Sequence, residues 1–285
     1  MGFSGTSGGA ISALLAWYGL LKNDEDKAIR LLNSFWKENS ANSLYDIFLN
    51  EWLVNVYRFP GGIAMLQPYL HPGKSDWAQS HLKGMLEKHI DFEEIKKLLT
   101  PSSPILLIGA IDINSGYFKN FKNAEINAEV MLASVALPIL YRAVHINGSA
   151  YWDGAFSQSY CVSGLVQGIS DAHLKPDEIW IIQTTRQKRN NHPQSLEEVL
   201  DRTYEIAGHL SLNKEVDFIK VVNKWLKEGT LSNNKYKHIE VREIKMKRDL
   251  HYTSKLDRDP AFIQEMMVYG EIQAEDFLNG WLANI

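Results

Sequence analysis

A serine within a glycine-rich pentapeptide is the first candidate for chemistry in this sequence. Gly5, Thr6, Ser7, Gly8 and Gly9 match the pattern G-x-S-x-G, between a short apolar start and a helix-forming segment. A nucleophilic serine needs a sharp strand-to-helix turn, and glycines two residues to either side prevent clashes there. Because the first N–H groups of a helix lack intrahelical partners, we expect Gly8 to donate to a developing oxyanion. A plain glycine-rich turn or a phosphate-binding loop would also suit this pentapeptide.

The second candidate is an aspartate that follows a predicted β-hairpin. Asn147 and Gly148 are a strong hairpin signal between two apolar stretches, and Asp153 emerges from the second of these. The neighbouring Gly154 lets the backbone turn sharply without blocking the nucleophile. A carboxylate within about 3 Å of a serine hydroxyl can accept its proton directly, so Asp153 is the predicted base. An ordinary Asp–Gly turn is the alternative.

A histidine-dependent hydrolase is a further alternative. Ser7, Asp153 and His251 occur in the chain order of an α/β-hydrolase triad. In that fold the serine follows several strands, whereas at most a fragment of one precedes Ser7. We therefore interpret His251 as a surface or hydrogen-bonded histidine.

The elements that must position these residues alternate between helices and strands. The longest apolar run, Ala10–Leu21, is shorter than the roughly 20 residues that span a bilayer and predicts a buried helix. Continuous short apolar runs predict buried strands, and spaced ones predict helices. Predicted strands are 104–112, 144–146, 150–152, 178–184 and 239–246, and predicted helices are 9–21, 24–37, 125–136, 196–226 and 260–282, with two short helices in the cap region, residues 44–70. The pattern predicts one α/β domain with a mostly parallel sheet flanked by helices.

Composition and charge narrow the function classes. The 285 residues are 45% hydrophobic and 22% charged, as in a globular chain with a sizeable core. A net charge of −4 gives no overall field that favours nucleic acid, so no nucleic-acid partner is predicted. The single cysteine, Cys161, excludes an internal disulfide and is interpreted as a small apolar residue. No targeting signal is visible, which suits a cytoplasmic protein or one at the membrane periphery.

Three motifs in order resemble the patatin-like phospholipases. They are Gly5–Ala10, Ala133–Pro138 with its Ser-x-x-x-Pro spacing, and Trp152–Ala155. Residues 108–121 also resemble the family's central strand and hairpin. Residues 185–202 and 252–274 resemble a bacterial branch with an extended carboxyl-terminal region, so the likeness covers nearly the whole chain.

The resemblance implies a three-layer patatin-like fold and a Ser-Asp dyad that hydrolyses lipid acyl esters. Ser7 matches the family's nucleophile and Asp153 its base, with Gly5, Gly8 and Gly9 at the elbow and Gly154 beside the base. Phospholipids or other lipid esters are the implied substrates, and peripheral membrane contact is compatible with them. No metal ion or organic cofactor is implied. Residues 1–285 are expected to form one domain with a helical extension over about 190–285.

One family element is not found ahead of the elbow. Patatin-like proteins carry an earlier strand and a glycine-rich loop that supplies oxyanion donors, and neither precedes Gly5 here. We favour the interpretation that the chain is an incomplete copy of a competent hydrolase. If Met1 is the true start, the loss of a donor typically costs about 10²- to 10³-fold in rate. A non-catalytic binding or scaffold protein with this fold is therefore the alternative function.

Two accessory regions have open interpretations. The apolar cap region suits either an acyl-chain groove or core packing. Arg186, Lys188 and Arg189 follow a buried strand, where they would meet lipid phosphate or, as we favour, form a solvated loop. The basic stretch over 235–248 is interleaved with acidic residues and predicts an edge strand protected by charge.

Overall fold

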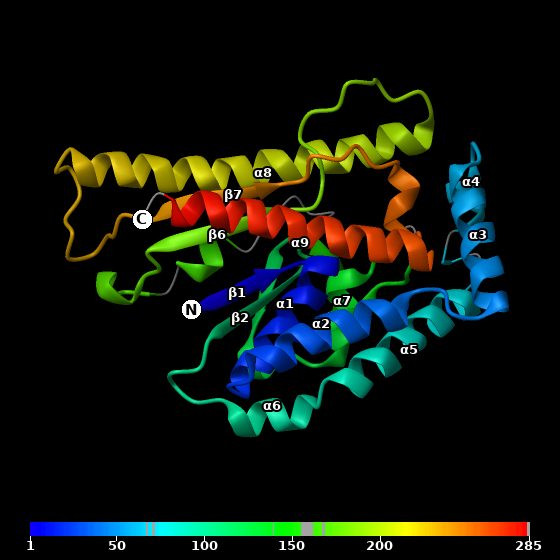
Figure 1. Ribbon diagram of the computed structural model, residues 1–285, viewed down its shortest axis with the longest axis horizontal. Helices are drawn as coiled ribbons and strands as arrows, with labels where there is room; N and C mark the ends of the chain where they lie inside the picture. Colours follow the sequence, from blue (N-terminus) through cyan, green and yellow to red (C-terminus); the bar gives the residue numbers. More distant parts are fainter. Residues whose placement is uncertain (67, 70–71, 139, 155–161, 167–168, 284–285) are drawn as a thin grey trace.

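Two β-sheets form the framework of the computed structural model, which describes residues 1–285 except 67, 70–71, 139, 155–161, 167–168 and 284–285 (Figure 1). Cys161 and Ala155 therefore lie outside the described residues. The strands are β1 (Gly2–Gly5), β2 (Ile105–Asp112), β3 (Phe118–Lys122), β4 (Val144–Ile146), β5 (Ser149–Asp153), β6 (Glu178–Gln183) and β7 (Glu240–Lys245).

The larger sheet has the order β1-β2-β5-β4, with β3 also paired to β2, and the smaller sheet joins β6 to β7. The pairs β1–β2 and β6–β7 are parallel, whereas β2–β3, β2–β5 and β4–β5 are antiparallel. The predicted α/β class is confirmed. The prediction of a mostly parallel sheet is wrong for the larger sheet, because short turns join β2 to β3 and β4 to β5, and such turns can only produce antiparallel pairs. Asn147 and Gly148 both have positive φ, as the predicted hairpin requires.

The main core lies where helices cover the larger sheet. Helix α1 (Gly8–Leu21) is buried along most of its length, as its sequence predicted, and Leu14, Leu15 and Trp17 are fully buried. These side chains pack with residues from β2 and four further helices. Those helices are α2 (Glu25–Asn39), α5 (Pro72–His89), α6 (Phe92–Leu98) and α7 (Ala128–Val135). The predicted helix over 125–136 begins later, because Asn127 caps α7 by accepting the N–H of Val130 at 2.9 Å.

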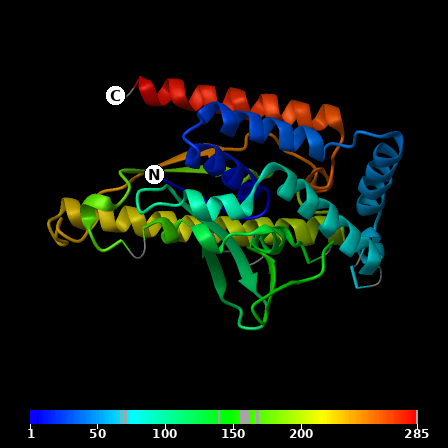
Figure 2. The same ribbon diagram turned by 90° about the horizontal axis from the view of Figure 1, so that it is seen from below.

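The smaller sheet lies between two long helices. Ile179 and Ile181 of β6 cluster with Leu212 and Val216 of α8 (Leu196–Lys227). Alternate residues of a strand point to opposite faces, and Trp180 packs on the other side against α9 (Pro260–Leu282), where its ring meets those of Phe277 and Trp281. Figure 2 shows α9 and α8 on opposite sides of these strands. The predicted helices and strands of this part are present within a few residues of their expected bounds.

The cap region forms one long helix, α3 (Leu44–Arg58), and a short one, α4 (Gly62–Met65). Polar contacts fasten it to the carboxyl-terminal part of the chain. Asn50 donates to Asp257 at 2.9 Å and accepts the N–H of Arg258 at 2.8 Å, and the hydroxyl of Tyr252 donates to the carbonyl oxygen of Tyr57. Tyr252 belongs to the short helix η5 (Tyr252–Lys255). Further single-turn helices among the described residues are η1 (Asn123–Glu125), η3 (Ser163–Leu165) and η4 (Ala172–Leu174).

No helix in the described part of the chain combines the length and apolar character that a bilayer crossing requires.

Candidate active site

Ser7 occupies the turn between β1 and α1. Its φ of 56° and ψ of −134° lie outside the regions that non-glycine residues ordinarily adopt. Such a conformation typically costs about 1–3 kcal/mol and persists only where neighbouring structure enforces it. The Ser7 side chain is half-buried and makes no capping hydrogen bond to α1. The turn therefore has the geometry of a nucleophile elbow, with a hydroxyl that is not used to cap the helix.

The glycines around Ser7 differ in what they contribute. A β-carbon on Gly5 would lie 2.4 Å from the carbonyl oxygen of Gly9, which no real side chain tolerates. A β-carbon on Gly8 would make ordinary contact with Trp36, and one on Gly9 would meet nothing within 4 Å. The close crossing of β1 and α1 thus requires glycine at position 5, whereas the two exposed glycines leave the start of α1 uncovered.

Ser134 holds the backbone of the elbow. The N–H of Ser7 donates to the carbonyl oxygen of Ser134 at 3.1 Å and to its hydroxyl oxygen at 3.2 Å. The Ser134 hydroxyl donates in turn to the carbonyl oxygen of Gly109 at 2.7 Å, and Ser134 is fully buried. The carboxyl end of α7 therefore links the elbow to β2. The Ser-x-x-x-Pro motif marked this residue in the sequence but did not reveal this contact.

The N–H of Ser7 is used by these acceptors, whereas the next residues begin α1. Gly8 and Gly9 are the first residues of α1, and N–H groups at these positions have no acceptor within their own helix. The helix dipole adds partial positive charge at the same place. The predicted oxyanion donors Gly8 and Gly9 therefore lie at the amino end of α1.

Asp153 reaches the same region from the other side of β2. It ends β5 opposite Ala110, while Gly5 ends β1 opposite Ile108, so both strands stop within two residues of each other along β2. Its N–H donates to the carbonyl oxygen of Ala136 at 3.0 Å, and the residue is fully buried. The segment 134–136 is therefore bonded to the backbone of Ser7 at one end and of Asp153 at the other.

The two predicted loops also touch through their neighbours. A β-carbon on Gly154 would lie 3.0 Å from the side chain of Thr6 and 2.7 Å from that of Phe118. Glycine at position 154 thus lets the residue after Asp153 pack against the residue before Ser7. The structure thus brings the residues next to Ser7 and Asp153 into contact.

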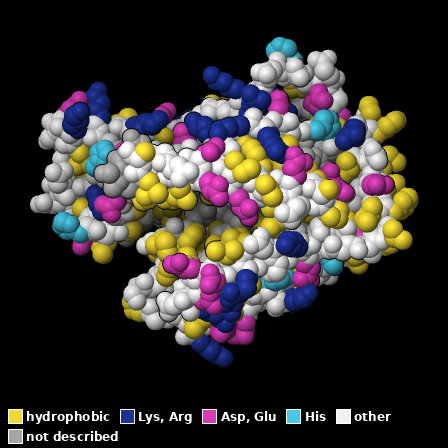
Figure 3. Space-filling model, in the orientation of Figure 1, with side chains coloured by type: hydrophobic (Ala, Val, Ile, Leu, Met, Phe, Trp, Pro, Cys, Tyr) yellow, Lys and Arg dark blue, Asp and Glu magenta, His cyan; other side chains and the backbone are white. Residues whose placement is uncertain are grey.

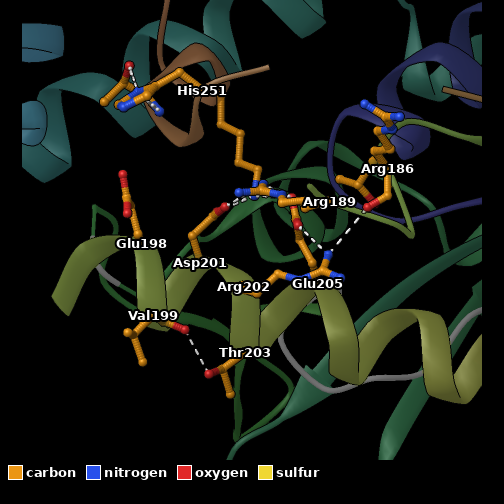
Figure 4. Close-up of polar contacts among 12 residues, drawn as sticks. Arg186, Arg189, Glu198, Val199, Asp201, Arg202, Thr203, Glu205 and His251 are labelled. Carbon is orange, nitrogen blue, oxygen red and sulfur yellow. Dashed lines mark hydrogen bonds and ion pairs between the residues drawn. The ribbon is translucent and has the colours of Figure 1, made fainter. Parts of the chain in front are cut away.

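His251 occupies a different environment. It caps η5, and its Nδ1 shares a hydrogen bond of 2.9 Å with the hydroxyl of Thr253. Burial, followed by the charge of Arg58, lowers the pKa of His251. Figure 4 shows its ring pointing away from Arg189 and Asp201. His251 thus caps η5.

The basic residues after β6 are paired with carboxylates. Arg189 lies 3.1 Å from Asp201 and 2.7 Å from Glu205, two buried residues of α8. Lys255 pairs with the same two carboxylates, and Arg202 holds Glu205 at 3.2 Å (Figure 4). Arg186 lies 3.7 Å from Asp249, and Lys188 is exposed. The solvated loop that we expected is thus correct for Lys188 but not for Arg189, whose ion pairs fasten the loop to α8.

Comparison with known proteins identifies the family of this chain. The sequence model of the patatin-like phospholipases matches residues 2–165, which include Ser7, Ser134 and Asp153. A search of the curated proteins finds no match. Since the matched residues make up more than half of the chain, this protein belongs to the patatin-like phospholipase family.

Proposed function

We propose that this protein is a lipid acyl hydrolase that cleaves carboxylic esters with Ser7 as the nucleophile and Asp153 as the base. Family membership supports the lipid hydrolase class. The observation that carries the residue assignment is the segment 134–136, which binds the N–H of Ser7 with one residue and the N–H of Asp153 with another. Strain at Ser7 and full burial of Asp153 are typical of functional groups.

The first half-reaction forms an acyl-enzyme. Burial strengthens the affinity of a carboxylate for a proton, so a buried aspartate can accept the proton of an adjacent hydroxyl. As Asp153 takes that proton, the Ser7 oxygen attacks the ester carbonyl carbon, and the Gly8 and Gly9 N–H groups stabilise the oxyanion. When the tetrahedral intermediate collapses, the bond to the alcohol oxygen breaks, and Asp153 returns its proton to that oxygen.

The second half-reaction reverses these roles with water. Asp153 accepts a proton from a water molecule, whose oxygen attacks the acyl carbon on Ser7. The bond to the Ser7 oxygen then breaks, the fatty acid leaves, and the proton passes to the serine. Ser7 and Asp153 end in their starting states, so the cycle needs no metal ion or organic cofactor.

Turnover of a soluble short-chain nitrophenyl ester tests this proposal. We expect the unchanged protein to release nitrophenol, and Ser7→Ala and Asp153→Asn to lose at least about 10³-fold in kcat, as in other hydrolases that lose a nucleophile or base. Ser4→Ala, in the strand β1 that precedes the turn, and His251→Ala are matched controls that should retain turnover.

The outcomes separate the competing functions. Full activity in Ser7→Ala would refute the assignment, and abolished turnover in His251→Ala would support the histidine-dependent alternative. A folded protein that shows neither turnover nor reaction with a fluorophosphonate would indicate the non-catalytic binding or scaffold function.

A further inference from the structure

Helix α3 exposes several large apolar side chains on its outer side. On its inner side the buried Asn50 side chain donates to Asp257, and the Tyr57 ring packs against the ring of Tyr252. The outward side chains of α3 include Leu44, which is 88% exposed, and Phe48, which is 63% exposed. A surface helix normally turns its apolar stripe toward the core. The outer face of α3 is therefore suited to an apolar environment outside the protein.

The exposed apolar side chains continue beyond α3 into α4 and the start of α5. We define the cap patch as eight large side chains that are all exposed: Leu44, Tyr45, Phe48, Trp52, Phe59, Met65, Tyr69 and Trp77. Figure 3 shows hydrophobic side chains along the right-hand rim of the molecule, over α3 and α4. Large contiguous apolar patches are rare on soluble monomers and mark sites of interaction.

The composition of the cap patch indicates what it binds. Six of its eight side chains are Tyr, Trp or Phe. Tyr and Trp gather at membrane–water interfaces because each combines an apolar ring with a polar atom, and Phe is common on the apolar face of interfacial helices. Residues 44–77 contain three acidic and two basic residues, Arg58 and Lys74. Binding to anionic lipid uses clusters of basic residues, which this stretch lacks. Charge and residue type together favour a zwitterionic lipid surface.

The strand that leads to the elbow points toward the cap. Figure 1 shows β1 running from the amino terminus in the direction of α3 and α4. Ser7 follows the carboxyl end of β1. The cap is held by buried polar contacts, among them the N–H of Gly61, which donates to Glu197 at 2.7 Å.

We propose that the cap patch docks this protein on a zwitterionic lipid surface and so brings the elbow to the acyl esters within it. Only the second part of this inference, that docking brings the elbow to acyl esters, rests on the proposed function, because docking itself needs no catalysis. Side chains of an interfacial helix enter the boundary between headgroups and acyl chains by about 5–10 Å. Phe48 and Tyr45 are placed to do so, since both are largely exposed on the outer face of α3.

Vesicle binding of the Ser7→Ala protein tests docking without hydrolysis. Phosphatidylcholine vesicles should co-sediment this protein, and adding Tyr45→Ser and Phe48→Ser should weaken the partition about tenfold or more, because two exposed aromatic side chains no longer enter the lipid. The matched control adds Leu210→Ser and Phe218→Ser on α8, where Phe218 is 65% exposed. Figure 1 shows α8 running away from the cap to the opposite end of the molecule. The control should bind like Ser7→Ala itself.

Three results would overturn the docking proposal. They are no binding by the Ser7→Ala protein, equal losses in the two double variants, and a dimer that becomes a monomer only when Tyr45 and Phe48 are changed. The last result would assign the patch to a second copy of the chain. With Ser7 intact, Tyr45→Ser/Phe48→Ser should turn over the soluble ester at the normal rate. If no protein that retains Ser7 hydrolyses the soluble ester, while vesicle binding still depends on Phe48, the proposed function is refuted and the docking proposal is supported.

Discussion

At the scale of single residues, the site depends on a strained serine and the groups that hold it. A positive φ at Ser7 is unfavourable, and the two acceptors of Ser134 stabilise it. Ser134 itself is oriented by its bond to the carbonyl oxygen of Gly109. In the proposed mechanism Ser134 acts on the Ser7 hydroxyl only through the backbone of Ser7, so its predicted role is that of a positioning residue.

Ser134→Ala should therefore reduce catalysis more than stability. The carbonyl oxygen of Ser134 remains as an acceptor for the N–H of Ser7. The substitution removes the Ser134 hydroxyl, which links that N–H to the carbonyl oxygen of Gly109 in β2. Small misplacement of reacting groups can cost about 10²-fold in rate, so we expect kcat to fall between tenfold and 10²-fold with little change in KM.

A buried serine elsewhere provides the control for this prediction. The Ser75 hydroxyl accepts the N–H of Arg142 at 3.1 Å. Ser75→Ala should lose about 1 kcal/mol of unfolding free energy, as one hydrogen bond typically contributes, and keep its kcat. Equal kcat in Ser134→Ala and the unchanged protein would contradict a positioning role.

At the scale of elements, α8 buries charged and polar groups in its first half. Its buried residues there are Glu197, Asp201, Glu205 and His209, whereas Leu212, Val216 and Ile219 follow in the second half. The sequence predicted the helix because its length and residue types are local properties. It did not predict which face is buried, since the carboxylates are neutralised by Arg189 and Lys255 from other segments.

The buried His209 gives α8 a predictable response to acid. Burial, as the largest cause, lowers the pKa of His209, while Glu205 opposes the shift and Arg202 and Lys245 add to it. Its Nε2 lies 3.3 Å from the hydroxyl of Thr185, and its Nδ1 has no hydrogen-bond partner within the described structure.

Since the pKa is lower in the folded state, the unfolded chain takes up a proton first as the pH falls below about 6.5. Stability is therefore complete above that pH and decreases below it. We expect the urea concentration at the midpoint of unfolding to decrease as the pH is lowered from about 7 to about 5. His209→Gln should make this decrease smaller. His145→Gln, an exposed histidine of β4, is the control and should fall like the unchanged protein. An identical pH dependence in His209→Gln would refute this account.

At the scale of the whole molecule, distant segments make the site and the cap. Ser7 binds a residue 127 positions away, and Asn50 binds one 207 positions away. Turn glycines, the hairpin and the buried helix α1 were predictable, because they follow from short-range patterns. The antiparallel order around β2 and the contacts of Ser134 and Asn50 were not predictable, because a sequence shows that a polar residue is present without showing its partner.

The elbow and the cap patch both belong to residues 2–165, which match the family. Elements from the carboxyl-terminal part of the chain contact the cap. Glu197 of α8 accepts the N–H of Gly61, and the hydroxyl of Tyr252 in η5 donates to the carbonyl oxygen of Tyr57.

The most direct test of the central claim is the rate at which a fluorophosphonate labels the intact protein, followed by mass spectrometry of the labelled peptide. The account predicts one covalent adduct on Ser7, no adduct in Ser7→Ala, and labelling slowed about 10²-fold or more in Asp153→Asn, because the serine oxygen then lacks its base. Ser134→Ala should label at an intermediate rate. An adduct on another residue, or unchanged labelling of Ser7 in Asp153→Asn, would contradict the pairing of these two residues.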